Sequence, residues 1–427
     1  ATVVQQALTG VTGGTGVPDS VRQALITGGS TLSVTNALDP DFRIPSQWRI
    51  ASSIDYVANL GFLGDEWRFG ADVIWSRVKD GIQYTDLRSV RNVVNATLPD
   101  GRPRYQQLAG LVGGFSVNPD LLLTNDSRGY SWNIVARVDK RWSSGVFFNA
   151  AYTFQRAKDT NSGTSSVAAS NYGQTAAADP NFSAYGTSIY QVDDAYRINV
   201  GIDRKIFGDN NTRIELFFNS RAGQRFSYTF ADTTPNRSAV FGTVGTNNRY
   251  LMYVPVVGGD PRVSYLTSSI LNSAGTAVSV TGIDQQGFLN FIQNSELNAY
   301  QGQIAPKNIG RSPRFNKLDL SVRQEIPFVF GGKMEVFADI ENVLNLINSD
   351  WGTLRQPGFP YMVNIANVRC AGFPTTGASP STPCTQYQLV GARAGTVANP
   401  VPAFQAPQLT TFNASLWGIR IGARVKF

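Results

Sequence analysis

The chain has 427 residues, of which 42% are hydrophobic, 11% aromatic and only 16% charged. Soluble domains carry about 25% Asp, Glu, Lys and Arg, so this composition favours a protein that exposes apolar and aromatic surface. The sequence has no His and two Cys, which excludes Ser-His-Asp triads, histidine-ligated catalytic zinc and four-thiolate metal sites. The net charge of +7 comes from basic residues scattered among acidic ones, so we expect no nucleic-acid partner.

The hydropathy pattern excludes membrane-spanning helices but not membrane-spanning strands. A membrane helix needs about 20 consecutive apolar residues, whereas the longest uncharged stretches here are rich in Ser, Thr, Asn, Gly or Pro. The mean hydropathy of −0.15 suits strands that are apolar on one face only. Residues 1–10 have neither the basic start nor the apolar core of a signal peptide. We therefore expect either that a signal was removed or that the chain begins partway through a longer protein.

Apolar and polar residues alternate with a period of two in nine segments, which predicts nine β-strands. In residues 130–142, for example, Trp132 and Ile134 share one face while Arg137 and Asp139 share the other. Residues 146–155 repeat the pattern after a short turn, which predicts an antiparallel hairpin. The predicted strands lie at residues 48–60, 67–75, 130–142, 146–155, 196–203, 213–218, 317–323, 333–341 and 417–427.

Short and long connections alternate between these predicted strands. The short ones lie at residues 61–65, 143–145, 207–210 and 327–332, and the long ones at about 88–128, 159–194, 231–313 and 345–408. Short turns on one rim and long loops on the other are typical of bacterial outer-membrane barrels. The sequence therefore predicts an all-β fold, in which residues 48–427 form part of an antiparallel transmembrane β-barrel of about nine to ten strands. Residues 1–47 are expected to form a loop or extracellular segment, and a soluble β-protein is the alternative.

The positions of the tryptophans favour the membrane alternative. Trp132 and Trp142 are ten residues apart on one predicted strand, which is about 33 Å of strand. With a tilt of about 40° this spacing matches the apolar band of a membrane barrel, which is about 25 Å tall. A soluble sandwich would instead concentrate its aromatic residues at the strand centres. We expect five aromatics at the membrane interfaces: Trp67, Trp75, Trp132, Trp142 and Trp417.

The opposite face of the predicted strands mixes charges of both signs. Two neighbouring segments carry most of them: Lys317, Asp319, Arg323, Glu325, Lys333, Glu335, Asp339 and Glu341. Cross-strand ion pairs are the simpler expectation for these residues. A charged channel for a substrate is the alternative.

Five stretches of the chain resemble a known family. They are LDPDFRIPSQWR (38–49), FLNFIQNSELNAYQGQIAPKN (288–308), RSPRFNKLDLSVRQEIP (311–327), EVFADIENVLNLINSDWG (335–352) and LWGIRIGARVKF (416–427). These stretches resemble TonB-dependent outer-membrane receptors, most closely the Oar-like group. The stretches between residues 288 and 352 are the specific part, whereas the terminal strand is shared by many outer-membrane proteins.

The resemblance implies a 22-stranded barrel with an N-terminal plug, which imports a scarce or bulky substrate with energy from the TonB complex. Nine strands cannot form such a barrel, and residues 1–47 contain no plug or TonB box. We therefore expect the chain to be the C-terminal barrel portion of a receptor. A complete small barrel that acts as an adhesin or passive pore is the alternative, if residues 1–47 and 353–369 supply further strands.

The resemblance also implies the location and the partners. The location is the bacterial outer membrane, where outer-membrane lipid and lipopolysaccharide surround the barrel. The barrel-assembly machinery reads a terminal strand that ends in Phe, here Phe427, and the TonB complex acts through an N-terminal region. The substrate is unknown. No cofactor, metal or enzymatic activity is expected, since an outer-membrane hydrolase would need an isolated pair of carboxylates that we do not find.

Two other patterns in the sequence bear on ligand binding. Residues 10–16, GVTGGTG, lack the Lys-Ser/Thr of a phosphate loop and no predicted strand leads into them, which favours a flexible loop. Calcium could be held by Asp39 and Asp41, together with Asp193 and Asp194 further along. Their spacing is not that of an EF-hand loop, which argues against a calcium site.

The longest loop offers two further candidates. Residues 248–253 are aromatic and basic, so Arg249, Tyr250 and Tyr253 are candidate ligand-binding residues, with simple packing as the alternative. Residues 284–300 break the strand rhythm. Asp284 can cap a helix, and apolar residues recur at close to helical spacing: Phe288, Phe291, Ile292 and Leu297. A short helix is predicted there, which either packs within the loop or acts as a lid or ligand-binding element.

The last long loop contains both cysteines, Cys370 and Cys384. An extracellular loop is an oxidising environment, which predicts a disulfide, and two free thiols are the alternative. Closing this loop would stabilise the fold by about 3 kcal/mol in the chain-entropy description.

Overall fold

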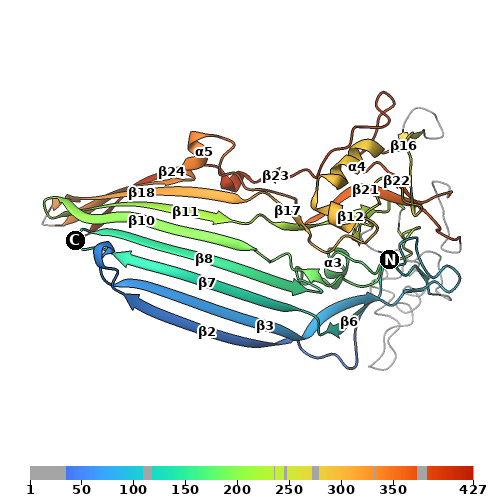
Figure 1. Cartoon of the computed structure of the whole chain (residues 1–427), viewed down its shortest axis with the longest axis horizontal. Coiled ribbons are helices and arrows are strands. Elements are labelled where there is room, and N and C mark those ends of the chain that lie inside the picture. Colours follow the sequence, from blue (N-terminus) through green and yellow to red (C-terminus); the bar gives the residue numbers. More distant parts are fainter. Residues whose placement is uncertain are drawn as a thin grey trace, which may run out of the picture.

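The molecule consists of a long antiparallel sheet with a second domain at one end (Figure 1). The computed structural model describes residues 35–426, except for 109–117, 235, 245–247, 272–277, 330–331 and 373–381. We call the second domain the loop domain, because it is built from the long connections at 87–129, 160–193, 222–314 and 342–417. No helix in the described part of the chain is long and apolar enough to cross a membrane.

Nine long strands of the large sheet follow one another in sequence order, each antiparallel to the next, which confirms the nine predicted strands and the predicted hairpin. Three short strands extend the sheet at the loop end: β1 (Asn36–Leu38), β6 (Leu121–Asp126) and β9 (Gly186–Thr187). The nine long strands are β2 (Ser46–Ala58), β3 (Trp67–Asp86), β7 (Tyr130–Arg141), β8 (Val146–Asp159), β10 (Asp194–Phe207), β11 (Asn210–Arg221), β18 (Phe315–Pro327), β19 (Lys333–Glu341) and β24 (Gly418–Lys426).

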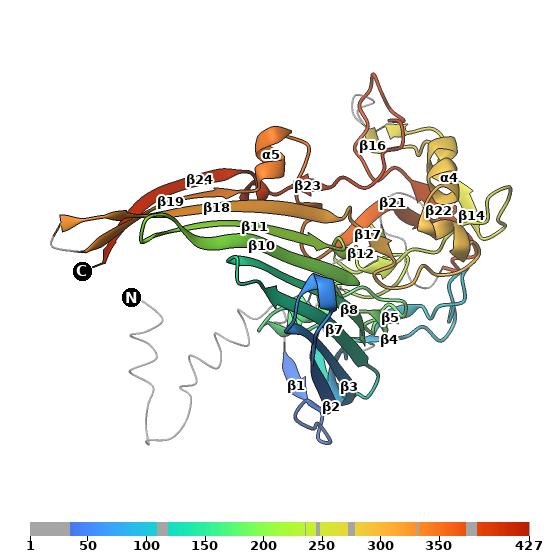
Figure 2. The same ribbon diagram turned by 60° about the vertical axis from the view of Figure 1, so that its left-hand side comes forward.

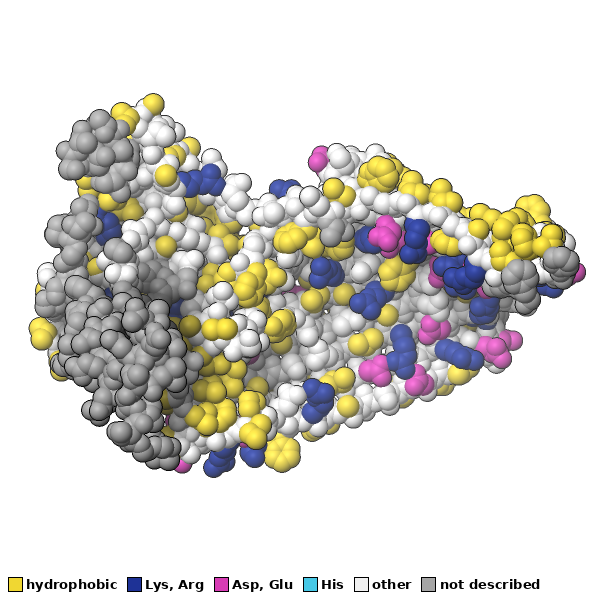
Figure 3. Space-filling model, turned by 180° about the vertical axis from the view of Figure 1, so that it is seen from behind, with side chains coloured by type: hydrophobic (Ala, Val, Ile, Leu, Met, Phe, Trp, Pro, Cys, Tyr) yellow, Lys and Arg dark blue, Asp and Glu magenta, His cyan; other side chains and the backbone are white. Residues whose placement is uncertain are grey.

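The strand register separates apolar from charged side chains. Because side chains alternate between the two faces of a sheet, every strand contributes to an apolar face and to a charged face. On the apolar face Ile54 is 67% exposed, Val200 39% and Ile421 74%, so this surface is not covered by the protein. Figure 3 shows Lys, Arg, Asp and Glu side chains gathered side by side over the strands.

Ion pairs between neighbouring strands hold the charged face. Lys333 lies 3.0 Å from Glu325 across the β18–β19 hairpin, and Lys317 lies 3.6 Å from Glu341 across the same pair of strands. Next to them, Arg420 on β24 pairs with Asp339 at 2.7 Å. The cross-strand ion pairs predicted for these segments are therefore confirmed.

The sheet is curved and has two open edges. Figure 2 shows that the strands turn progressively from β24 to β2. Within the described residues β2 pairs with β3 alone, and β24 pairs with β19 alone. Residues 353–369 contribute β20 (Arg355–Gln356) and most of β21 (Met362–Cys370), which both lie in the loop domain. They add no strand to the large sheet, so the small-barrel alternative loses one of its two expected sources of strands.

A second sheet organises the loop domain. In spatial order it contains β13 (Tyr250–Leu251), β12 (Arg225–Ala231), β21, β22 (Tyr387–Val390) and β14 (Val263–Tyr265), and β17 (Gly310–Arg311) also pairs with β12. Two-stranded ladders join β4 (Ser89–Arg91) to β5 (Tyr105–Gln107), β15 (Ile270–Leu271) to β16 (Val278–Val280), and β20 to β23 (Thr410–Thr411). The helices are α3 (Ala168–Gly173), α4 (Gln285–Gln293) and α5 (Val343–Ile347), with 3-10 turns η1 (Gly61–Leu63), η2 (Glu296–Tyr300) and η4 (Asn413–Ser415).

The main hydrophobic core lies inside the loop domain. Its cluster joins the second sheet to α4 and η2, and fully buried members include Phe230, Phe288, Ile292, Leu297 and Leu389. The two parts of the molecule therefore bury apolar surface differently: the loop domain has an interior, whereas the large sheet keeps an uncovered apolar face.

Candidate functional site

Tryptophans occupy both ends of the large sheet. At the turn end the Trp67 and Trp142 rings meet edge to face with their centroids 5.7 Å apart, and both indole N–H groups donate to the carbonyl oxygen of Leu63, at 3.2 and 3.3 Å. At the loop end Trp75 and Trp132 are directly opposite in the β3–β7 register, with centroids 6.2 Å apart. Trp417 precedes β24 at the same end.

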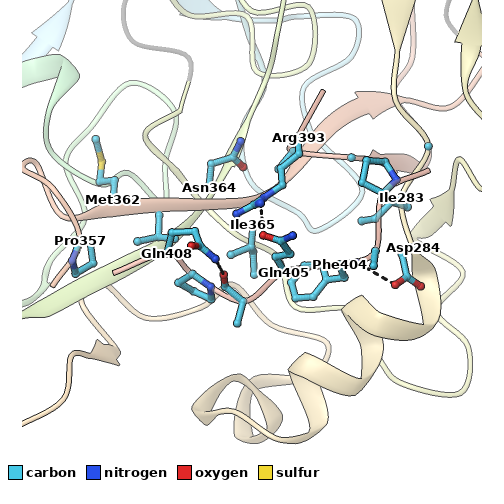
Figure 4. A pocket seen from close by; sticks show the side chains of 18 of the residues that line it. Ile283, Asp284, Pro357, Met362, Asn364, Ile365, Arg393, Phe404, Gln405 and Gln408 are labelled. Carbon is cyan, nitrogen blue, oxygen red and sulfur yellow. Dashed lines mark hydrogen bonds between the residues drawn. The ribbon is translucent and has the colours of Figure 1, made fainter. Parts of the chain in front are cut away.

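A pocket of about 310 Å³ lies in the loop domain, between segments of two long loops (Figure 4). Residues 362–365 of β21 form one wall and residues 402–408 form another, while residues 282–284 close one end. The remaining lining comes from residues 357–358 and 391–393. Gly, Ala and Pro are frequent in these segments, so backbone groups lie close to the cavity.

Asp284 fixes the shape of this pocket. One carboxylate oxygen accepts a 3.0 Å hydrogen bond from the Gly287 amide, which caps α4, and the other accepts a 3.0 Å hydrogen bond from the Phe404 amide. The hydrogen bond from the Phe404 amide, followed by the one from the Gly287 amide, lowers the pKa of Asp284 below its ordinary value of 3.8. The carboxylate therefore ties the wall at 402–408 to the start of α4.

The Phe404 ring anchors the same wall from the other side. It packs against Phe288 and Phe291 of α4, with centroid distances of 5.6 and 5.3 Å. Further along, the Arg393 guanidinium donates to the side-chain oxygen of Gln405. This segment without regular secondary structure is thus held in place by an aromatic cluster, a carboxylate and a guanidinium.

The polar side chains that line the pocket are one carboxylate, one cation and three amides. Its one carboxylate, Asp284, already accepts two backbone hydrogen bonds. Side-chain amides of Asn364, Gln405 and Gln408 and the exposed cation Arg393 supply polar contacts. A neutral polar ligand, or one that carries a single negative group, fits this arrangement.

The structure places Arg249, Tyr250 and Tyr253, the candidate ligand-binding residues, in the interior of the loop domain rather than on an exposed surface. Each of the three is 1% exposed. Tyr250 stacks on Phe241 with a centroid distance of 3.8 Å, and the Arg249 guanidinium lies 4.1 Å from the centre of the Tyr172 ring. Burial raises the pKa of Tyr253 to about 12, and its hydroxyl donates to Asp260 at 2.8 Å. Apolar rings with one polar end are buried here with their partners, which is the packing alternative.

The predicted helix in the longest loop is present as α4. Asp284 caps it, and Phe288, Ile292 and Leu297 are fully buried in the core. Packing within the loop domain is therefore the role that the structure gives to this segment, and its N-terminal end also borders the pocket.

The predicted disulfide is also present. Cys370, the last residue of β21, is bonded to Cys384, and their Cα atoms are 5.2 Å apart. The bond joins β21 to the segment that leads into β22, directly beside the pairing of Cys370 with Tyr387. It stiffens the strand that forms one wall of the pocket.

Other predicted sites do not converge. Asp193 is bound by Arg225 and Arg311, and Asp194 by Arg314, so both carboxylates have cationic partners. Within the described ranges no group of three or more Asp, Glu or Cys residues is placed to hold a metal ion. Residues 10–16 and Phe427 lie outside the described residues.

The sequence pattern gave no signal for the pocket. Its wall at 402–408, PAFQAPQ, has neither strand alternation nor helical spacing. The wall at 362–365 does alternate, in MVNIANV (362–368), but it lies within the long connection predicted at 345–408. No protein-family model and no curated protein matches this chain.

Proposed function

We propose that the chain is the C-terminal barrel portion of a TonB-dependent outer-membrane receptor of the Oar-like kind. In this proposal the large sheet is the membrane wall and the loop domain is the extracellular part that captures a scarce or bulky substrate. The single observation that carries the proposal is the uncovered apolar face of nine consecutive antiparallel strands. The sequence resemblance to the family adds the direction of transport and the dependence on the TonB complex.

Exposure of the apolar face to water would be unfavourable, which supports a lipid environment. Large side chains such as Trp48, Ile50 and Ile421 are 65%, 63% and 74% exposed. Soluble monomers rarely expose contiguous apolar patches of more than a few hundred Å², and this face extends across all nine strands. In a bilayer this face would contact hydrocarbon chains instead of water. The backbone groups of the strands are satisfied by strand pairing.

The two pairs of tryptophans support a fixed depth in the membrane. Trp67 and Trp75 are eight residues apart on β3, or about 26 Å of strand. Indole rings prefer the boundary between hydrocarbon and headgroups. The short turns would then lie in the periplasm and the loop domain outside the cell.

The open edges of the large sheet support the assignment to a larger barrel. Among the residues that the structure describes, one side of β2 and one side of β24 are unpaired. Hydrocarbon does not tolerate unpaired backbone groups, so in this proposal further strands join both edges. A 22-stranded receptor supplies them between β24 and β2. In such a barrel the pocket beside β21 would face the arriving substrate.

The mass of the native protein, measured in isolated outer membranes with N-terminal sequencing, tests this proposal. A plugged barrel of 22 strands requires a mass about twice the 46.4 kDa of this chain. A native mass near 46.4 kDa would contradict the proposal, and the chain would then have to act as a closed small barrel, as an adhesin or passive pore.

A further inference from the structure

A cluster of cations lies at the loop end of the apolar face, next to Trp75 and Trp132. The strand register builds it in two rows. In the first row Trp75, Trp132 and Arg156 lie opposite one another on β3, β7 and β8. In the second row, two residues further toward the loop domain, the aligned residues are Arg77, Tyr130 and Lys158.

All six side chains of these rows point to the same side as the apolar face. Residues that are directly opposite in an antiparallel sheet share a face, with Cβ atoms about 4.5–5.5 Å apart. Ile134, two residues from Trp132, is on that face and 37% exposed. The cations therefore point outward, away from the ion pairs on the charged face.

A groove of about 600 Å³ runs between these rows and the adjoining turn. It is lined by Trp75, Arg77, Tyr130, Trp132 and Arg156 together with residues 127–129 and Tyr185. The Tyr185 ring lies between two cations: Arg128 is 5.7 Å and Lys158 is 5.8 Å from its centre. The groove thus has aromatic walls and a cationic rim.

The positive charge of this cluster exceeds the negative charge beside it. Arg128 is matched by Asp126, at 2.5 Å. Arg156 is 3.8 Å from Asp193, but that carboxylate also binds Arg225 and Arg311. Arg77 and Lys158 are exposed and have no ion pair with any residue that the structure describes. Two cations are therefore free to bind an anion.

We propose that this cluster, which we call the rim cation site, binds the phosphate groups of an anionic lipid in the outer leaflet. Arg77 and Lys158 contact the phosphates, and the acyl chains lie along Trp75 and Trp132 on the apolar face. The assignment rests on the proposed function, because it requires that the apolar face is in a membrane with the loop domain outside. Charge complementarity and the continuity of the groove with the apolar face select a lipid over a soluble anion.

The test uses the full native receptor in nanodiscs of zwitterionic lipid, titrated with lipopolysaccharide that carries two lipid A phosphates. The double variant Arg77→Gln/Lys158→Gln is expected to bind about thirtyfold more weakly, as two cations near an anionic lipid surface provide. The matched control, Arg204→Gln/Lys205→Gln, also removes two charges, but at the turn end of β10, and should bind like the unmodified protein.

Lipopolysaccharide from which the lipid A phosphates have been removed should bind weakly to all three proteins. Equal binding of phosphorylated lipid by the double variant and the unmodified protein would overturn the proposal. Competition by inorganic phosphate alone as strong as by the lipid would also overturn it, since the site would then be a simple anion site. A protein that does not insert into the bilayer would overturn the proposed function itself, whereas insertion with unchanged lipid binding would overturn only the rim cation site.

Discussion

The guanidinium of Arg137 on β7 donates a 2.5 Å hydrogen bond to the carboxylate of Asp55 on β2, although β3 lies between the two strands. The same guanidinium also pairs with Asp72 on β3. Gly70 makes this reach possible, because it lies opposite both Asp55 and Arg137 in the register. One arginine therefore connects three strands and helps to hold the edge strand β2 to the sheet.

We expect Gly70→Ala to loosen β2. A Cβ atom at this position would lie 2.4 Å from Nε of Arg137, so the guanidinium would have to leave its place between the two carboxylates. The contact is with the end of a flexible side chain, so the change removes the ion pairs of Arg137 with Asp55 and Asp72 rather than overpacking a core. Thermal unfolding in detergent, followed by circular dichroism, should show a lower transition temperature.

Gly418→Ala on β24 is the matched control for Gly70. A Cβ atom at Gly418 meets no heavy atom within 4 Å, so the transition temperature should stay unchanged. An equal change of the transition temperature in the two variants would contradict the inference that Gly70 leaves the space in which the Arg137 side chain crosses β3.

Removal of the disulfide should destabilise the loop domain and leave the large sheet intact. Cys370→Ser/Cys384→Ser removes a crosslink over a sequence separation of 14, which is worth about 3 kcal/mol. Hydrogen exchange of residues 362–370 should become faster, while exchange in β10 and β11 should not change. Reduction of the unmodified protein should reproduce the effect, and faster exchange in the large sheet would contradict it.

Truncation of Phe288 should open the pocket. This side chain is 0% exposed and supports Phe404 in the pocket wall, so Phe288→Ala is expected to cost about 3–5 kcal/mol. Limited proteolysis should cut residues 402–408 sooner. Gln285→Ala, an exposed change in the same helix, should leave the cleavage rate as it is, and equally rapid cleavage in that variant would count against the packing role of α4.

Acid should weaken the link between α4 and the pocket wall through Asp284. The folded pKa of Asp284 is lowered by the amides of Phe404 and Gly287, so its stabilisation is present above the ordinary value of 3.8 and is lost as the pH falls through the folded pKa. At pH 7 Asp284→Ala should unfold more easily than the unmodified loop domain, by about 1 kcal/mol. The difference should shrink below about pH 4, and a difference independent of pH would refute this role.

The large sheet could be predicted from the sequence because its signal is local. In residues 130–142 the alternation of Trp132 and Ile134 with Ser131 and Asn133 is visible within one strand, since one face is apolar and the other polar. The loop-domain sheet carries no comparable signal. Its parallel ladder pairs Ser227 with Met362, and nothing in a single sequence connects two such distant segments.

The candidate sites divide in the same way. The disulfide and the cap at Asp284 depend on few residues close in sequence, and both are present. Tyr250 and Tyr253 look like exposed ligand contacts because they are polar aromatics, but both rings are buried and their hydroxyl groups are hydrogen-bonded to Thr243 and to the half-buried Asp260. Whether an aromatic ring is buried depends on the packing of the whole loop domain, which spacing does not encode.

The central claim is that the apolar face of the large sheet is in contact with lipid. It is tested most directly by spin labels on single cysteines along β10, at Arg197, Ile198, Asn199 and Val200, with the native disulfide retained and the receptor in bilayers. We predict that oxygen dissolved in lipid relaxes the labels at positions 198 and 200, whereas a water-soluble nickel complex relaxes those at positions 197 and 199. Equal access of the nickel complex to all four positions would contradict the account.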